Sequence, residues 1–206
     1  MGSRAMTYAF QDHYFHRAKK EHVLARAVYK LEEIQNRYKL LKPGYRVLDL
    51  GAFPGSWLQF TGDIIGSKGL VIGVDMKNLT HSFPGNVIFL QHDIFEPGFA
   101  EELAAGYAPI DVVLSDMAPA TSGIRVADSA RSALLFEQAL RVAKMTLKPH
   151  GHFLAKIFQG PDFHGLLPEV KKTFTQVKVV KPAASRKQSK EVYILAMGFK
   201  RIEGGG

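Results

Sequence analysis

The spacing of apolar residues changes along this sequence, and the first regular stretch has the period of a helix. Between residues 22 and 38, apolar side chains recur at steps of three and four, which predicts an amphipathic helix that ends at the Lys-Pro-Gly run of residues 42–44. Lys30 lies on the apolar face of this helix, three residues after Ala27 and four before Ile34. The apolar positions of this face are Val23, Ala27, Leu31, Ile34 and Tyr38.

Beyond residue 44, short runs rich in Val, Ile and Leu alternate with segments of helical period. This alternation predicts a parallel sheet with helices on both faces, because strands without polar alternation are buried on both sides. The later helices are expected near residues 127–147 and around residues 163–173. The expected parallel strands are "RVLDLGA", "GLVIGVD", "NVIFLQHD", "DVVLSDMA" and "HFLAKIF".

The last two strands are expected to be antiparallel. The runs "QVKVVKP" and "EVYILAMGFK" are separated only by "AASRKQSK", and this loop is too short for the crossover that two parallel strands need. The predicted fold class is therefore α/β, with a Rossmann-like, mostly parallel, doubly wound sheet and an antiparallel last strand.

Length and composition predict one soluble domain. The chain has 206 residues, of which 46% are hydrophobic and 22% charged, and these are the proportions of an ordinary globular protein. We therefore treat residues 1–206 as a single domain, with about residues 1–6 and 204–206 expected to be cloning-derived or disordered ends. No apolar run reaches the roughly 18 residues of a membrane span, and no signal-peptide core is present, so the expected location is the cytoplasm.

The residue types disfavour two kinds of chemistry. Cysteine is absent, which excludes disulfides, thiolate metal sites and cysteine nucleophiles. The 8 histidines are scattered without a metal-ligand spacing, so no metal site is predicted.

The net charge of +8 is concentrated at the two ends of the chain. Residues 1–42 hold nine Lys and Arg against four Asp and Glu, and residues 170–201 hold nine against one. Such asymmetry suggests a polyanion partner, although a solvated basic surface is an alternative. The interleaved aromatic residues Tyr14 and Phe15 favour RNA, so residues 7–42 are expected to be a basic, RNA-facing segment with its helix. The candidate RNA-binding residues are Arg17, Lys19, Lys20, Arg186, Lys187 and Lys190.

Polar or glycine residues follow the expected strands, at the edge where doubly wound sheets bind ligands. In "DLGAFPGSW", Gly51 and Gly55 permit close backbone approach in a turn that opens a helix, although this is not a GxGxxG fingerprint. Asp75 ends the second strand at the offset where a carboxylate meets ribose hydroxyls in dinucleotide folds. Asp93 ends the third strand, where it suits either an adenine amino group or the N-cap of the following helix.

A lysine interrupts the last of the expected parallel strands. "HFLAKIF" places Lys156 among apolar residues, where an unpaired ammonium is costly. One alternative is structural, a lysine near a strand end whose ammonium reaches water. The other is compensation by acids, since Asp116 ends the fourth strand and Glu191 begins the last one. With Lys30 on the first helix, two lysines and two acids could converge.

These blocks together resemble the FtsJ/RrmJ-type RNA 2′-O-ribose methyltransferases. The resemblance runs from about Tyr14 to Lys200 and rests on "RAVYKLEEI", "VLDLGAFPGSW", "VLSDMAP…SG", "AKIFQG" and "SRKQSKEVYI", in this order. It implies a Rossmann-like fold of S-adenosylmethionine-dependent methyltransferases and a catalytic tetrad of Lys30, Asp116, Lys156 and Glu191.

The resemblance also implies the cofactor and the reaction. Such enzymes move the methyl group of S-adenosylmethionine to a ribose 2′-hydroxyl, with Lys156 as the candidate base. Whether its amine accepts the proton, or only orients the oxygen while water accepts it, stays open. Trp57 has helix packing as an alternative role. The implied cofactor-binding residues are Gly51, Gly55, Trp57, Asp75, Asp93 and Asp116.

The expected partner is ribosomal RNA of the large subunit, with a uridine as acceptor and a monomeric enzyme without membrane contact. Ser56 stands where the family commonly has the second glycine of "PGGW". Serine also occurs there in relatives that act on transfer RNA, which keeps transfer RNA as an alternative. A nicotinamide-dependent oxidoreductase is disfavoured by the imperfect glycine fingerprint. A non-catalytic RNA-binding ribosome-assembly factor is disfavoured by the complete tetrad.

Overall fold

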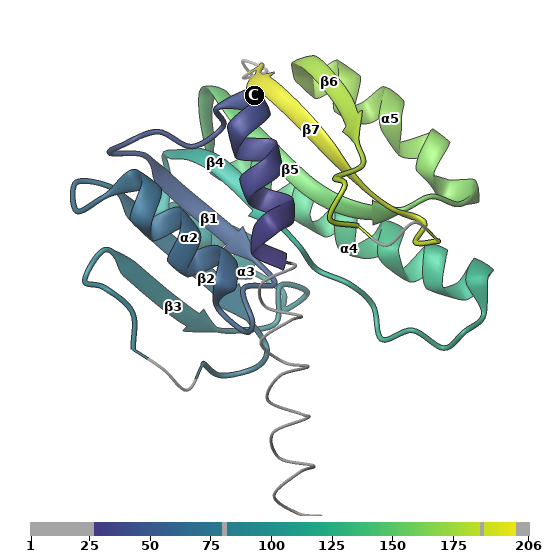
Figure 1. Ribbon diagram of the computed structural model, residues 1–206, viewed down its shortest axis with the longest axis horizontal. Helices are drawn as coiled ribbons and strands as arrows, with labels where there is room; N and C mark the ends of the chain where they lie inside the picture. The colour runs from purple at the N-terminus through teal and green to yellow at the C-terminus, as the bar shows by residue number, and fades with distance from the viewer. Residues whose placement is uncertain (1–26, 80–81, 186–187, 201–206) are drawn as a thin grey trace, which may run out of the picture.

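A computed structural model describes residues 27–79, 82–185 and 188–200, and places them in one sheet with helices on both faces (Figure 1). The strands are β1 (Arg46–Leu50), β2 (Leu70–Asp75), β3 (Val87–Gln91), β4 (Ile110–Ser115), β5 (Leu147–Phe158), β6 (Phe174–Val180) and β7 (Glu191–Phe199). The labelled helices are α2 (Ser56–Ile65), α3 (Phe99–Tyr107), α4 (Arg125–Thr146) and α5 (Pro161–Thr173). Residues 27–38, drawn in purple, form the helix that precedes β1.

The sheet has the order β3-β2-β1-β4-β5-β7-β6. β1 to β5 are parallel to one another, whereas β7 runs antiparallel to both β5 and β6. The predicted doubly wound sheet with an antiparallel last pair is confirmed. The chain leaves β1 in one direction through β2 and β3, and in the other through β4, so the gap between the loops after β1 and β4 is the topological switch point where such folds bind ligands.

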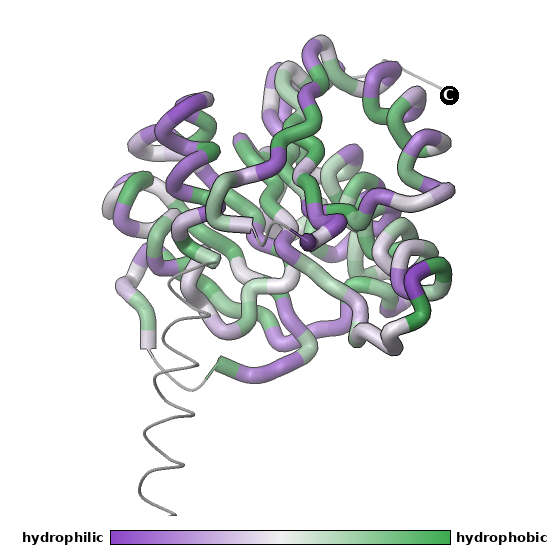
Figure 2. Tube along the Cα trace, turned by 45° about the vertical axis from the view of Figure 1, so that its right-hand side comes forward, coloured by the Kyte–Doolittle hydropathy of each residue, from purple (hydrophilic) through white to green (hydrophobic). Residues whose placement is uncertain are grey.

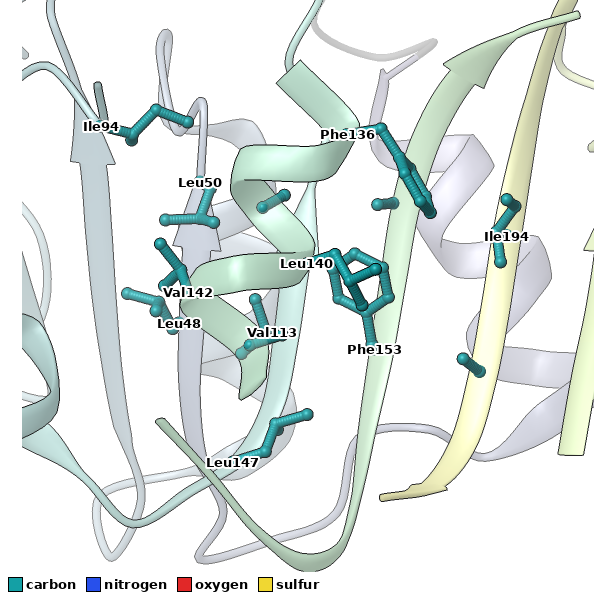
Figure 3. Close-up of a cluster of buried hydrophobic side chains, with 14 of the residues drawn as sticks. Leu48, Leu50, Ile94, Val113, Phe136, Leu140, Val142, Leu147, Phe153 and Ile194 are labelled. Atoms are coloured by element: carbon teal, nitrogen blue, oxygen red, sulfur yellow. The ribbon is translucent and has the colours of Figure 1, made fainter. Parts of the chain in front are cut away.

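Alternate residues of the strands pack into two separate cores. In the first, Phe136 and Leu140 of α4 point toward Phe153 of β5 (Figure 3). Leu48 and Leu50 of β1 belong to this core, and the intervening strand residues face the helix of residues 27–38 and α2. In Figure 2, hydrophobic and hydrophilic residues alternate along the turns of the helices, as expected for helices with one buried face. No helix among these described residues is long and apolar enough to cross a membrane.

The helix before β1 carries the predicted apolar face. Leu31 and Ile34 are buried in the second core, and Ala27 and Tyr38 pack against it. Val23, the first position of the predicted face, lies outside the described residues. The helix ends at residue 38 rather than at the Lys-Pro-Gly run. Lys39 takes a positive φ of 52°, which ends the helix before that run.

The chain then leaves the helix as an ordered turn. The Gln35 side chain donates to the Leu41 carbonyl at 2.8 Å and accepts from the Leu41 amide at 2.7 Å. These two bonds satisfy backbone groups that a continuing helix would have paired. The two later helices begin and end within two residues of the predicted ranges, and α5 has the proline favoured at its first position.

Candidate active site

The carboxyl edge of the sheet, where β1, β2 and β4 end, is hollowed by a cavity of about 560 Å³. A cavity of this size accommodates a nucleoside-sized ligand. Its walls come from the loops after β1, β2, β3 and β4, as the switch point predicts. Four of the six expected cofactor residues line it, namely Gly51, Asp75, Asp93 and Asp116, together with the aromatic residues Phe53 and Phe95.

Gly51 brings the loop after β1 close to the loop after β4. Its φ is 78°, and a Cβ there would lie 2.5 Å from Cγ and 3.1 Å from Cα of Met117. Only glycine fits this left-handed position without displacing Met117. The close backbone approach that Gly51 permits is therefore between the loops after β1 and β4. Gly55 has a φ of 102° and precedes the first turn of α2, outside the cavity lining.

Two aspartates in the cavity are oriented by backbone amides. Asp75 accepts from the Phe53 amide at 3.0 Å through Oδ2, and from the Lys77 amide at 2.9 Å through Oδ1. Each oxygen keeps further acceptor capacity, which suits a pair of adjacent hydroxyl groups. The carboxylate is thus fixed between the loops that follow β1 and β2.

Asp93 belongs to a turn of its own. Its Oδ1 accepts from the Phe95 amide at 3.0 Å, two residues on, which is an Asx-type turn. The alternative that Asp93 caps the following helix is wrong, because α3 begins at Phe99 and its N-cap is Gly98.

Asp49 is a candidate site residue that sequence reasoning missed. This β1 residue is 0% exposed, and neither carboxylate oxygen has a hydrogen-bond partner among the described residues. Burial, followed by the nearby charges of Asp116 and Asp75, raises its pKa well above the usual range. Burial without a partner disfavours the anion, and a cation nearby would favour it again. The sequence signal was an acid inside an apolar strand, the counterpart of Lys156 in β5.

The structure brings the four expected tetrad residues together as two ion pairs. Lys30 Nζ lies 2.6 Å from Glu191 Oε1, and Lys156 Nζ lies 2.9 Å from Asp116 Oδ1. Lys156 also donates to the Asp116 main-chain carbonyl. Lys156 is only 7% exposed, so its ammonium is compensated inside the protein rather than hydrated at a strand end.

Strand geometry explains why these pairs are adjacent. Lys156 of β5 lies opposite Tyr193 of β7 in the antiparallel register, and Glu191 is two residues before Tyr193 on the same face. The Tyr193 hydroxyl donates to Asp116 Oδ1 at 2.5 Å. Burial, followed by the charges of Asp116 and Glu191, raises the pKa of Tyr193 well above its usual value, so the phenol stays protonated as a donor. The sequence alone did not identify Tyr193.

Trp57 packs against Tyr193 of this centre. Its ring stacks on Tyr193 with centroids 6.0 Å apart, and its Nε1 donates to the Ala27 carbonyl at 2.7 Å. Trp57 is buried and lies outside the cavity lining, so these contacts favour the helix-packing alternative. The bond to Ala27 joins α2 to the helix that carries Lys30.

The loop after Asp116 is held in place by α4. Asp128 accepts from the amide and hydroxyl of Ser122, both at 2.9 Å, and from the Gly123 amide at 3.2 Å. Arg131 also binds this carboxylate at 2.6 Å. The Ser122 amide is the main cause that lowers the pKa of Asp128, with the bond from Arg131 adding to it. The loop that contributes Met117 to the cavity is thereby fixed at its far end.

Only one of the six expected RNA-binding residues can be placed. Lys190 is exposed beside the centre, and its carbonyl accepts from the Gln159 amide at 2.9 Å. The others, Arg17, Lys19, Lys20, Arg186 and Lys187, lie outside the described residues.

Comparisons with known proteins show which family this chain resembles. A family profile described as FtsJ-like methyltransferase matches residues 23–199. The ribosomal RNA large subunit methyltransferase E of Syntrophobacter fumaroxidans is 63% identical over 196 residues, covering 95% of this chain and 100% of that protein. The protein of the same name from Bdellovibrio bacteriovorus is 48% identical over 200 residues, covering 95% and 100%.

Solved structures share the fold. A putative ribosomal RNA methyltransferase from Plasmodium falciparum has a TM-score of 0.74 at 29% identity, covering 84% of this chain and 97% of that one. Aeropyrum pernix fibrillarin, solved with natively bound S-adenosyl-L-methionine, has a TM-score of 0.53 at 17% identity, covering 76% and 68%. The second likeness is one of fold alone.

Proposed function

The chain belongs to the FtsJ-like methyltransferase family, and we propose that it transfers the methyl group of S-adenosylmethionine to a ribose 2′-hydroxyl of large-subunit ribosomal RNA, with a uridine as acceptor. The observation that carries the proposal is the position of Asp116, which lines the cavity and also binds Lys156. A cofactor site and a paired lysine therefore share one residue. Relatives matching nearly the whole chain are named for ribosomal RNA, which favours it over transfer RNA.

The residues at the carboxyl edge fit S-adenosylmethionine. The two oxygens of Asp75 suit its ribose hydroxyls, and Asp93 suits its adenine amino group. Asp49 is not among the residues that line the cavity, but its carboxyl group is close enough to Asp75 and Asp116, which do line it, to feel their charges. A cation in the cavity would favour its ionised form, and this cofactor carries two positive charges, on an ammonium and a sulfonium. When bound, the cofactor supplies an electrophilic methyl group on sulfur.

Lys156 is placed to hold the acceptor oxygen. The carboxylate and the carbonyl of Asp116 accept two of the three hydrogen bonds that an ammonium can donate. The third donor remains for the ribose 2′-oxygen. A hydroxyl held in this way keeps one orientation toward the cofactor cavity, and such positioning supplies much of the acceleration in group transfer. In the transfer, the 2′-oxygen would bond to the methyl carbon as the bond from that carbon to sulfur breaks, and the hydroxyl proton would leave either to water or to the amine of Lys156 in its neutral form.

Lys30 and Glu191 form the second ion pair of the centre, outside the lining of the cofactor cavity. Ser185 donates to Glu191 Oε1 at 3.2 Å, so the carboxylate that binds Lys30 is itself oriented. We assign this pair to orienting the incoming ribose. We place the methyl transfer at Lys156 rather than at Lys30. Asp116, the partner of Lys156, lines the cofactor cavity, whereas Glu191, the partner of Lys30, does not.

The identity of the methylated nucleoside tests the proposal. The protein is incubated with tritiated S-adenosylmethionine and large ribosomal subunits from cells that lack this methyltransferase, and the RNA is digested to nucleosides. We expect the label in 2′-O-methyluridine, with small subunits as the unlabelled control. Label in a base-methylated nucleoside would contradict ribose transfer, and label in another 2′-O-methyl nucleoside would overturn the uridine assignment alone.

A further inference from the structure

Three Phe, Tyr or Trp side chains are exposed in the described part of the chain. They are Tyr29, Phe53 and Phe95, with exposed fractions of 55%, 40% and 49%. Phe53 and Phe95 line the cofactor cavity, which accounts for their exposure. Tyr29 lies on the helix of residues 27–38, outside that lining. A single exposed ring is ordinary on a protein surface, so its position has to decide whether it has a role.

Tyr29 lies beside the catalytic centre. It immediately precedes Lys30, whose Nζ is 2.6 Å from Glu191. Four residues after Tyr29, on the same face of the helix, Glu33 accepts from the Ala183 amide at 2.7 Å. The shared face therefore looks toward the loop that joins β6 and β7. Tyr29 is thus an exposed ring on the helix face that is turned toward this loop, next in sequence to Lys30.

The charges near this helix face suit a polyanion. Glu33 and Glu191 are both engaged, since Glu33 accepts from the Ala183 amide and Glu191 binds Lys30 and Ser185. Lys190 is exposed on the loop side. A flat ring next to basic groups is the arrangement with which proteins bind unpaired nucleotides, where the base stacks on the ring and cations meet the phosphates.

We infer that Tyr29 is a stacking platform for an unpaired base of the acceptor RNA strand, at or next to the nucleotide that is methylated. The inference rests on the proposed function. A ribose reaches the buried Lys156 only if its nucleotide leaves the stack of an RNA helix, and this loss of stacking opposes binding. The Tyr29 ring replaces the lost contact. It also places the base on the side of the centre where Lys30 and Glu191 meet the ribose.

Two substitutions of Tyr29 separate stacking from other roles. Tyr29→Leu keeps an apolar side chain without a flat ring, and Tyr29→Phe keeps the ring without the hydroxyl. We expect Tyr29→Leu to bind a single-stranded oligouridylate about tenfold more weakly, and to raise the KM for large ribosomal subunits about as much. Tyr29→Phe should match the parent within about twofold, as stacking needs only the ring. Calorimetry with S-adenosylmethionine should give parental affinity for both variants, and kcat at saturating RNA should be close to parental.

The salt dependence gives a readout that a merely structural role would not produce. Stacking releases no counterions, so the slope of log affinity against log salt should be the same for Tyr29→Leu and the parent. Lys190→Gln is the matched control, in which loss of a phosphate contact reduces that slope by about one.

Three results would overturn the stacking role: parental affinity in Tyr29→Leu, an equal loss in Tyr29→Phe, or a changed salt slope in Tyr29→Leu. Each of these leaves the proposed function standing as long as the parent protein methylates ribosomal RNA. A parent that neither binds nor methylates RNA would instead contradict the proposed function itself.

Discussion

The two edges of the sheet carry cavities of nearly equal size but of different chemistry. The cavity at the carboxyl edge measures about 560 Å³, and the one at the amino edge, between α4, β5 and β7, measures about 590 Å³. The amino-edge cavity is bordered by Lys144, Lys148 and Lys200, which at first sight suggest an anion site. The carboxyl-edge cavity is instead bordered by aspartates.

The lysines of the amino edge already have partners. Lys144 pairs with Glu169, and Lys148 pairs with Asp111. Lys200 donates to two main-chain carbonyls in the last turn of α5, at 3.3 and 3.4 Å. The helices α3, α4 and α5 all end at this edge, and cations are favourable at helix C-termini. The basic groups here are explained by the fold.

The carboxyl edge differs because it holds a buried carboxyl group without a hydrogen-bond partner among the described residues. Asp49 is buried without a partner, and Asp116 links the cavity to Lys156. Cavity volume alone would not distinguish the two edges. The comparison teaches that an unpartnered buried carboxyl group, rather than cavity volume, distinguishes the proposed site in this molecule.

The largest expected effect distinguishes a lysine from each edge. Lys156→Met keeps the aliphatic stem and removes the charged nitrogen, so methyl transfer to large ribosomal subunits should fall by at least about 100-fold. Binding of S-adenosylmethionine, measured by calorimetry, should stay close to parental. Lys144→Met is the matched control and should retain parental turnover. A folded Lys156→Met protein with parental turnover would remove Lys156 from the mechanism.

The next effect concerns cofactor affinity. Asp75→Ala removes both acceptors expected to meet the cofactor ribose, and hydrogen bonds to a charged group contribute about 1.5–3 kcal/mol each, so the Kd for S-adenosylmethionine should rise at least about tenfold. Asp63→Ala, which changes an exposed acid on α2, serves as the control. Equal affinities for the two variants in calorimetry would refute the assignment of Asp75.

Asp49 gives a pH-dependent effect on stability. Its pKa is raised in the folded protein, so the folded state holds its proton at pH values where the unfolded chain has lost it. Its contribution to stability is full below the unfolded pKa of about 3.9 and declines as the pH rises toward the folded pKa, by at most about 1.4 kcal/mol per pH unit. Asp49→Asn lacks this decline.

Thermal melts of the parent and Asp49→Asn measure this effect. The melting temperature of Asp49→Asn, relative to the parent, should therefore increase between pH 4.5 and pH 8. The same variant should bind S-adenosylmethionine more weakly, because its amide, unlike the carboxyl group, cannot ionise when the cationic cofactor binds. A difference in melting temperature that stays constant with pH would mean that Asp49 titrates normally.

The smallest effect is expected at the amino edge. Lys148→Met removes the ion pair to Asp111, but that carboxylate still accepts from the Arg46 amide at 2.7 Å. The loss of stability should be about 1 kcal/mol or less, as for other partly exposed ion pairs, and turnover should not change. Denaturant unfolding and methyl transfer measure the two quantities. A loss of turnover comparable to that of Lys156→Met would give the amino edge a function.

Much of the fold could be predicted because it depends on local pattern. The alternation of apolar strands and helices predicted the parallel sheet, and one short loop predicted the antiparallel pair of β6 and β7. The convergence of Lys156 with Asp116 and Glu191 was expected because one acid ends the fourth strand and the other begins the last one. These features follow from strand period and loop length, which are visible in a single sequence.

The parts that were missed depend on register and on distant contacts. Tyr193 joins the centre only because β5 and β7 pair with Lys156 opposite it. Asp49 looked like one polar residue in an apolar strand until its burial without a partner was known. Helix capping was an alternative role for Asp93, but α3 begins only at Phe99 and has Gly98 as its N-cap. The helix before β1 ends earlier than its breaker residues, because the Gln35 side chain satisfies the turn at Leu41.

The most direct test of the difference between the two edges is a crystal structure of the protein with S-adenosylhomocysteine, the product of the cofactor. The account predicts density in the carboxyl-edge cavity, with the ribose hydroxyls on Asp75 and the amino-acid portion toward Asp49. Density in the cavity between Met145 and Phe199 at the amino edge, with the carboxyl edge empty, would contradict it.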